Sequence, residues 1–319
     1  MEPTMKSAIY LRFIIGSLLL AFSGGNLIAA KKAPTYVSSG IGYPSLSFQA
    51  DNEGSESTAS STVDVEYEPD VPLVGFVGIS WRGFSLSLSQ QLEDDGSKMT
   101  FSDYKIGLNF SWIGFDMSYS EFSRFKISSG KGFSNSIESR NKSRNDLDVS
   151  LISTNIYIFP LSLGFDFNTA FEPALPKTSG IALGLILNGN QLEVSTEQGF
   201  IPAVWQDDFG SDGGFSKGTL TGRGAHLAIS GVLSVKGMYF SGLYSVGPGS
   251  QDYEYTARDT ERSGSGDTVN TNIKGNIGFV GKSFFTTLEG SLDTPSYTLK
   301  HMSLSASRQE ARLILGYKW

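Results

Sequence analysis

The stretch that decides the fold is the end of the chain, Glu310-Ala-Arg-Leu-Ile-Leu-Gly-Tyr-Lys-Trp319. Counted back from Trp319, every second residue is apolar or aromatic, and the residues between them are mostly small or charged. Successive side chains of a β-strand point to opposite faces, so one face of this strand is apolar. Such a face is awkward on an exposed edge of a soluble sheet, whereas in a membrane barrel it contacts lipid. The stretch therefore predicts a strand of a transmembrane β-barrel; an amphipathic strand of a soluble sheet is the alternative.

The composition agrees with a barrel and excludes other classes. The hydrophobic fraction is 39% and the mean hydropathy is −0.11, which is too polar for a bundle of helices that each need about 20 apolar residues. A barrel remains compatible, because its lumen and lipid faces alternate and average out. The chain has no Cys, so disulfides and thiolate metal sites are excluded. The net charge of −7 argues against a nucleic-acid partner held by phosphate contacts.

The first residues have the pattern of a targeting segment. Lys6 and Arg12 precede an apolar run, Phe13 to Phe22, and small residues follow up to Ala30. This order is typical of a secretory signal peptide. We predict a signal peptide over residues 1–30, cleaved after Ala30 or alternatively after Ser23, and a barrel domain over residues 31–319.

A repeated short turn organises the rest of the chain. Trp81-Arg-Gly-Phe84, Trp112-Ile-Gly-Phe115 and Val235-Lys-Gly-Met238 each place an X-Gly pair between apolar residues that begin alternating stretches. Gly supplies the positive φ that tight hairpin turns require. We expect further short turns at Phe159-Pro-Leu161, Asn188-Gly-Asn190 and Val280-Gly-Lys-Ser283.

The other ends of these predicted strands are joined by longer polar segments, at residues 92–100, 122–145, 170–178, 196–220, 256–267 and 293–303. Short turns on one side and long loops on the other are typical of outer-membrane barrels, whose short turns are periplasmic. We therefore predict an all-β fold, a transmembrane antiparallel up-and-down β-barrel of about 14 strands, with 12 as the alternative count, short periplasmic turns and long extracellular loops.

Two resemblances support this prediction. The last strand, with Leu313, Leu315, Tyr317 and the terminal Trp319, resembles the assembly signal of bacterial outer-membrane barrels, which implies the barrel-assembly machinery as a partner. The chain also resembles a bacterial barrel family, the domain-of-unknown-function family forty-four twenty-one. The matching stretches are Ser179-Gly-Ile-Ala-Leu-Gly-Leu185, Phe200-Ile-Pro202, Tyr244-Ser-Val-Gly-Pro-Gly249, Gly278-Phe-Val-Gly-Lys-Ser-Phe-Phe285 and Arg312-Leu-Ile-Leu-Gly-Tyr317. This resemblance implies an outer-membrane location and no particular activity.

One long connection differs from the others because it is apolar. Gln198-Gly-Phe-Ile-Pro-Ala-Val-Trp-Gln-Asp-Asp-Phe209 lies inside an otherwise polar and Gly-rich segment. An apolar loop of this length usually packs against something. We expect Phe200, Ile201, Val204 and Trp205 to fold over or into the barrel mouth and narrow it. The alternative is a lid on the rim or an exposed patch that binds a partner.

Charged residues are also expected on the lumen face, among them Lys105, Asp116, Asp166 and Arg312. Small polar neighbours leave space for water, but charges of both signs are equally able to pair and fill the lumen. Of the two histidines, His226 lies on the same predicted strand as Ser230, and along a strand two residues already span about 7 Å. The two side chains are therefore too far apart for His226 to act as a base on Ser230. His301 lies among serines in a loop. We predict no catalytic residue, no metal site and no cofactor.

The function expected from the sequence is a passive channel or transporter for small solutes. A non-conducting structural or adhesive barrel is the alternative, and a lipid-modifying barrel enzyme a distant third. The expected partners are outer-membrane lipid and lipopolysaccharide. The sequence leaves the solute, the oligomeric state and the loop partners open.

Overall fold

The computed structural model describes residues 35–52, 64–70, 73–92, 101–131, 143–175, 177–299 and 302–319. The predicted signal peptide, residues 1–30, lies outside these ranges, as does His301. Within them, no helix is both long enough and apolar enough to cross a membrane.

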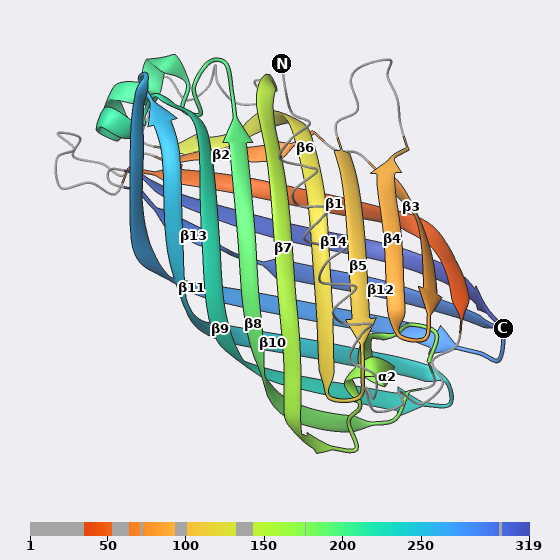
Figure 1. Cartoon of the computed structure of the whole chain (residues 1–319). Helices are drawn as coiled ribbons and strands as arrows, with labels where there is room; N and C mark the ends of the chain where they lie inside the picture. Colours follow the sequence, from red (N-terminus) through yellow and green to blue (C-terminus); the bar gives the residue numbers. More distant parts are fainter. Residues whose placement is uncertain are drawn as a thin grey trace. The chain divides into compact units, whose positions relative to one another are not determined.

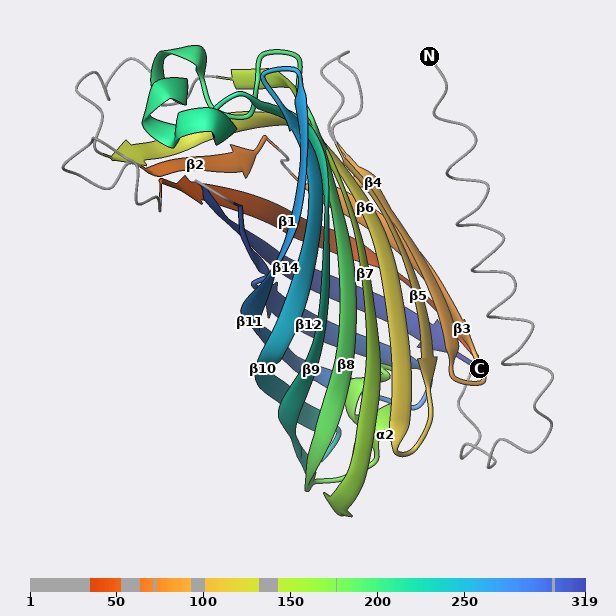
Figure 2. The same cartoon turned by 60° about the vertical axis from the view of Figure 1, so that its left-hand side comes forward.

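Nearly all of the described chain belongs to one antiparallel sheet (Figure 1). Its 14 strands are β1 (Tyr36–Asp51), β2 (Asp64–Pro69), β3 (Val74–Trp81), β4 (Phe84–Gln91), β5 (Phe101–Asn109), β6 (Ile113–Lys131), β7 (Ser143–Leu163), β8 (Gly180–Ser195), β9 (Phe215–Val235), β10 (Met238–Ala257), β11 (Thr260–Val280), β12 (Phe284–Asp293), β13 (Ser296–Thr298) and β14 (Ser303–Lys318). Two short helices, α2 (Phe167–Phe171) and η1 (Ala203–Asp212), lie at opposite ends of the barrel (Figure 2).

The sheet closes on itself because β1 pairs with β14 along its whole length. The closed circuit runs through β1, β3, β4, β5, β6, β7, β8, β9, β10, β11, β12 and β14, which is twelve strands. The transmembrane antiparallel up-and-down β-barrel predicted from the sequence is therefore confirmed. Of the two predicted counts, 14 is the number of strand segments in the sheet and 12 is the number in the circuit.

The two counts differ mainly because the wall beside β1 is formed by two separate segments, β2 and β3, instead of one continuous strand. The upper part of β1, Phe48–Asp51, pairs with β2, and its lower part, Tyr36–Gly42, pairs with β3. On its other side β2 pairs with β6, whereas β3 pairs with β4. The hairpin of β4 and β5 is therefore inserted into the wall only in the half of the barrel that holds the chain's C-terminal end.

The last strand has the faces that its sequence predicts. Leu313, Leu315 and Tyr317 are exposed on the outside, whereas Arg312 and Ile314 are buried on the inside. This alternation places apolar side chains against lipid and a charged side chain in the interior.

Of the six predicted turns, three are confirmed, one is displaced and two are wrong. Residues 281–283 join β11 to β12 as predicted. The turn between β5 and β6 lies at residues 110–112, because Ile113 and Gly114 already belong to β6. Arg82-Gly83 and Lys236-Gly237 form tight turns in which both residues have positive φ, as hairpins of this kind require. Pro160, however, lies inside β7, where a register shift between Ile158 and Leu161 accommodates it. Asn188-Gly-Asn190 lies inside β8 and forms no turn.

The predicted loop lengths need three corrections. Residues 122–145 are shorter as a connection than predicted, because β6 continues to Lys131 and β7 begins at Ser143. Residues 256–267 are not a long loop, because β10 and β11 continue through them to a tight turn at Arg258-Asp259. Residues 170–178 form a long connection, but they lie at the end of the barrel that carries the short turns. They belong to the segment between β7 and β8 that contains α2.

The outer surface shows how far the barrel extends beyond the membrane. On β9 the outward side chains are apolar in the lower half, including Leu227, Ile229 and Leu233, and polar above, including Lys217 and Arg223. About 9–11 residues of a tilted strand cross a bilayer, which corresponds to the lower half of this 21-residue strand. The upper half therefore projects into water on the side away from the short turns.

Candidate functional site

The interior of the projecting half is filled by an apolar core. Its side chains come from most strands of the ring and from the connection between β8 and β9, and they include Phe48, Tyr67, Phe122, Phe125, Leu192, Phe200, Ile201, Trp205, Phe209, Phe215 and Tyr297. The Phe200 ring makes edge-to-face or tilted contacts with the rings of Phe48, Tyr67 and Phe215, with centroids 4.8–6.1 Å apart. Three of the four residues expected at the mouth, Phe200, Ile201 and Trp205, are thus buried inside the barrel; the side chain of Val204 lies outside the described set.

Arg144 on β7 fixes this connection to the barrel wall. Its guanidinium is held by Asp146 at 2.9 Å and 3.0 Å, and it donates to the carbonyl oxygens of Gly199 at 2.6 Å and Phe200 at 3.0 Å. The Tyr67 hydroxyl donates to the same Phe200 oxygen at 2.5 Å. Arg144 is only 3% exposed, so its charge is compensated by Asp146 and by these backbone oxygens. We call this set the Arg144 clamp.

The other end of the connection is fixed to the projecting hairpin of β10 and β11. Asp212, the last residue of η1, is fully buried and accepts hydrogen bonds from the Tyr255 hydroxyl at 2.8 Å and from Arg262 at 2.9 Å. Residues 196–214 are therefore attached at both ends and closed over the interior.

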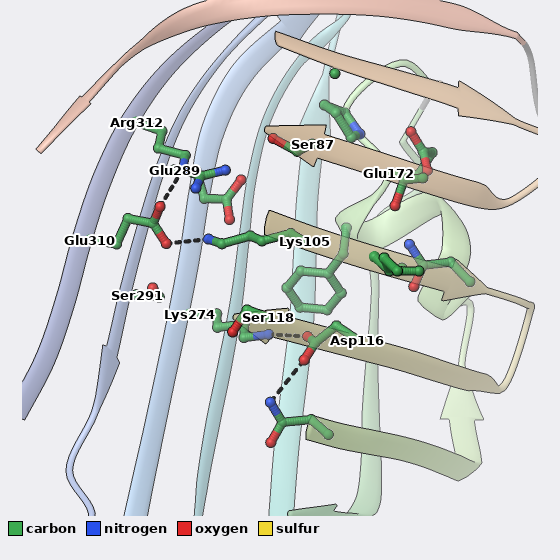
Figure 3. Close-up of a pocket in the computed structure, with 18 of the residues that line it drawn as sticks. Ser87, Lys105, Asp116, Ser118, Glu172, Lys274, Glu289, Ser291, Glu310 and Arg312 are labelled. Carbon is green, nitrogen blue, oxygen red and sulfur yellow. Dashed lines mark hydrogen bonds and ion pairs between the residues drawn. The ribbon is translucent and has the colours of Figure 1, made fainter. Parts of the chain in front are cut away.

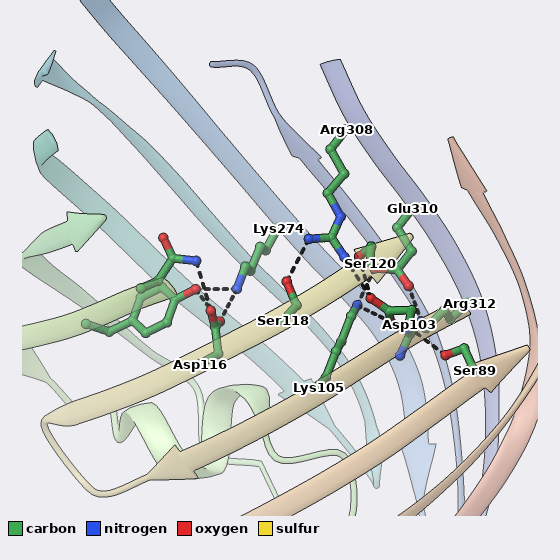
Figure 4. Close-up of polar contacts among 12 residues, drawn as sticks. Ser89, Asp103, Lys105, Asp116, Ser118, Ser120, Lys274, Arg308, Glu310 and Arg312 are labelled. Atoms are coloured by element: carbon green, nitrogen blue, oxygen red, sulfur yellow. Dashed lines mark hydrogen bonds and ion pairs between the residues drawn. The ribbon is translucent and has the colours of Figure 1, made fainter. Parts of the chain in front are cut away.

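A layer of ion pairs lies beneath the apolar core (Figure 4). Asp103 on β5 is 1% exposed and accepts hydrogen bonds from Arg308 at 3.1 Å, Arg312 at 2.8 Å and Ser120 at 2.7 Å. Lys105 pairs with Glu310, which also pairs with Arg312. Since β5 and β14 do not neighbour each other in the sheet, these contacts cross the lumen.

A second group of polar contacts crosses the barrel between β11 and β6. Lys274 pairs with Asp116 at 2.6 Å and also contacts the Tyr157 hydroxyl. Asp116 accepts further hydrogen bonds from that hydroxyl at 2.5 Å and from Asn155 at 2.8 Å. Of the four expected lumen charges, Lys105, Asp116 and Arg312 thus lie in the interior and form cross-lumen ion pairs.

These ion pairs border a cavity of about 250 Å³. Its wall carries charges of both signs, serine hydroxyls and the carboxamide of Asn272; Figure 3 shows Lys105, Asp116, Lys274, Glu289, Glu310 and Arg312 around it, with Glu172 at one end. The volume is enough for several waters or one small polar molecule.

The end of this cavity on the side of the short turns is closed by the segment between β7 and β8, which we call the plug (residues 164–179). Phe167 stacks on Tyr157 and Phe159, with centroids 5.0 Å and 5.4 Å apart. A side chain at position 114 would lie 2.1 Å from the Phe167 ring, so Gly114 makes room for the plug. The expected lumen residue Asp166 instead caps α2 by accepting a hydrogen bond from the Thr169 N–H at 3.0 Å.

Two charged residues of the plug are tied to the barrel interior. Glu172 is 2% exposed and hydrogen-bonded to Tyr36 on β1. Lys177 donates from its ammonium to the backbone oxygens of Thr169 and Glu172. Burial raises the pKa of Glu172 to about 7, although Tyr36 and Lys177 act in the opposite direction.

This raised pKa predicts a stability that falls with rising pH. The Glu172 carboxyl binds its proton more tightly in the folded protein, so its contribution is complete below about pH 4.5 and is lost as the pH passes about 7. We expect the melting temperature of the refolded barrel to drop between about pH 4.5 and pH 7, and Glu172→Gln to reduce that drop. Above about pH 7 burial of Lys177, whose pKa is lowered to about 7, acts in the opposite direction. Glu68→Gln, at an exposed position, is the control. A drop of the same size in Glu172→Gln would contradict the assignment.

No arrangement for catalysis is evident around His226. The side chain is fully buried and neither ring nitrogen is hydrogen-bonded within the described part of the chain. The Ser230 hydroxyl donates to the Gly242 backbone oxygen at 2.9 Å. Among the described residues no group of three or more potential metal ligands is found.

Sequence reasoning missed the partners of the expected charges and the plug. Asp103 and Arg308 were not singled out, because pairs across a lumen depend on which strands face each other after closure. The plug carries one readable signal, Asp166 three residues before Thr169, which is the spacing of a helix N-cap.

Comparison with known proteins gives similarity of fold alone. Neither the family models nor the curated proteins compared with the chain match it. Among solved structures it is similar to the outer membrane protease OmpT from Escherichia coli, with 9% identity, a TM-score of 0.43 and coverage of 92% of this chain and 99% of that one. It is also similar to the attachment invasion locus protein Ail of Yersinia pestis (11% identity, TM-score 0.29, coverage 66% and 99%) and to the P. putida toluene transporter TodX (8%, 0.27, 90% and 90%).

Proposed function

We propose that the protein is a closed outer-membrane barrel that does not conduct solutes at rest and that serves as a binding platform on the cell surface. It is neither an enzyme nor a permanently open pore. The observation that carries this proposal is the filled interior, in which Phe200 and its apolar neighbours occupy the projecting half.

The closure is made of three barriers in series along the lumen. The apolar core is held by the Arg144 clamp, the ion pairs around Asp103 lie beneath it, and the plug closes the periplasmic end. Each barrier uses different residues, so removing one leaves the other two. The projecting half of the barrel supports the platform role, because it presents a large surface to water.

A gated channel for small solutes is the second candidate, and the cavity of about 250 Å³ is the observation that favours it. Two of the three barriers are single connecting segments, residues 196–214 and the plug, which are able to move without unpairing the wall. The cavity between them has charges of both signs, so such a channel would take small polar solutes.

Planar-bilayer recording distinguishes the two candidates. We expect refolded protein of residues 31–319 to give no conductance steps, and a variant without residues 198–209 to remain silent, because the ion pairs and the plug persist. A third variant that also lacks residues 166–175 tests the plug. Discrete steps in the wild-type protein, or steps that appear when residues 198–209 are removed, would contradict the closed barrel and support the channel.

The proposal also covers the cellular location of the protein and its insertion into the membrane. Residues 1–30 would direct export, and the exposed face of β14 with Trp319 would be read by the barrel-assembly machinery. The apolar outer band, with residues such as Leu227 and Phe240, would contact outer-membrane lipid, and the wall just above it lipopolysaccharide.

A further inference from the structure

The projecting half of the wall has a sheet edge with a partner on one side only. Strand β11 pairs with β10 along its whole length, from Thr260 to Phe279. Its pairing with β12 begins only at Asn272, opposite Asp293. Strand β13, which follows β12, pairs with β14 and not with β11. Among the described strands, none pairs with the part of β11 that precedes Thr271 on the side opposite β10.

The backbone groups that point to this open side can be identified. The Thr271 backbone oxygen accepts from Thr294 N–H at 3.2 Å, so residue 271 faces the side of β12. In an antiparallel sheet the N–H and C=O of every second residue point to the same side. Glu261, Ser263, Ser265 and Asp267 therefore direct their backbone donors and acceptors to the open side. We call the stretch 261–267 the free edge.

The free edge lies in water. The outward side chains of β11 include the exposed apolar residues Ile277, Ile273 and Val269, whereas those of the free edge are all polar and exposed. A sheet edge in water is a template on which another extended chain can pair. Natural edges are usually protected by Pro, Lys or a bulge. The free edge has none of these, and its one basic side chain, Arg262, points inward to Asp212.

The charge beside the free edge selects the partner. Glu261 and Asp267 are exposed on it, and Glu254 on β10 lies directly opposite Ser263. A second copy of the chain is a poor occupant, because antiparallel pairing of two free edges would place Glu261 opposite Asp267. Like charges in that position are destabilising, whereas opposite charges stabilise.

We propose that the free edge binds an extended, positively charged peptide segment of a partner, which adds to β11 as an antiparallel strand. Basic residues six positions apart on the segment would face Glu261 and Asp267. The inference deepens the proposed platform function by naming where the platform binds and the class of partner.

The test uses the full refolded barrel and a labelled synthetic peptide of twelve residues, alternating Thr and Val, with Lys at two positions six apart. Hydrogen exchange of the amides of residues 261–267 and fluorescence anisotropy are measured together. We expect the peptide to protect these amides. Ser265→Pro, which removes an N–H directed to the open side, is expected to weaken binding at least tenfold, while Ser265→Ala retains the N–H and binds like wild type.

Two further comparisons make the test decisive. Charge reversal by Glu261→Lys with Asp267→Lys is expected to weaken binding, and Glu68→Lys, an acidic position on β2 away from the free edge, is the matched control. The same peptide with alternate backbone amides methylated should not bind. Equal binding of the methylated peptide, or unprotected amides at 261–267, would overturn the proposal. Self-association that Ser265→Pro abolishes would also overturn it in favour of a second copy. Conductance is measured separately, so an open barrel would refute the closed barrel without altering this result.

Discussion

Replacing Arg144 by methionine is expected to lower the free energy of unfolding by roughly 3–5 kcal/mol, the usual loss when one member of a buried ion pair is removed. Methionine fills much of the same space but has no donors. Asp146 would keep a charge without its partner, and the carbonyl oxygens of Gly199 and Phe200 would each lose a donor. The measurement is equilibrium urea unfolding of the refolded barrel in micelles, together with protease cleavage within residues 196–214.

The chain provides a matched control for this prediction. Arg223 forms an ion pair with Asp252 on the outside of the same half, and its side chain is 69% exposed. An exposed pair of this kind contributes about 0–1 kcal/mol, so Arg223→Met should change little. Arg144→Lys is expected to fall between the two, since an ammonium cannot reproduce the bidentate contact with Asp146. Equal losses for Arg144→Met and Arg223→Met would contradict the role of the clamp.

Replacing Asp103 by asparagine is the second change with a large expected effect. The carboxylate is the common partner of Arg308 and Arg312, and the amide would leave two cationic side chains near each other in the interior. We again expect a loss of roughly 3–5 kcal/mol, because a buried charge without its partner is costly. Urea unfolding gives the value, and the heat-dependent mobility of the barrel on gels shows whether it still folds.

A double-mutant cycle tests whether the loss arises at the ion pair. Arg312→Met removes one of the cations, so the combined variant with Asp103→Asn should lose less than the sum of the two single variants. Additive losses would show that Asp103 acts through other contacts. Glu68→Gln is the exposed control, since its contact with Lys126 is 4.0 Å long and lies on the surface.

The sequence predicted the membrane-spanning half better than the projecting half, and the reason is physical. On β14 lipid requires apolar residues outside and the lumen accepts polar ones, so the alternation is readable. On the upper part of β11 water covers the outside, and the inner positions include Gly264 and Gly266 beneath Tyr253 and Gln251. Neither face of this part of the strand is apolar, so the sequence pattern of residues 256–267 predicted a loop.

The site shows a similar division. The inward direction of Arg312 follows from its position in the strand, and the burial of Phe200 follows from an apolar loop in polar surroundings. The pairing of Arg312 with Asp103 depends on the closed circuit, which brings β5 and β14 across from each other. Asp166 was placed on a strand because Leu163, Phe165 and Phe167 alternate, but the chain leaves the wall after Leu163 and enters a short helix.

The interruption between β2 and β3 changes the number of strands in the wall along the barrel axis. Between β1 and β6 the wall holds three strands in the membrane, β3, β4 and β5, but β2 alone in the projecting half. Two fewer strands shorten that side of the wall by about 10 Å, at a spacing of about 4.8 Å per strand. That side of the wall is therefore shorter in the projecting half, and the interior behind it is filled by one connecting segment, residues 196–214, without a separate inserted domain.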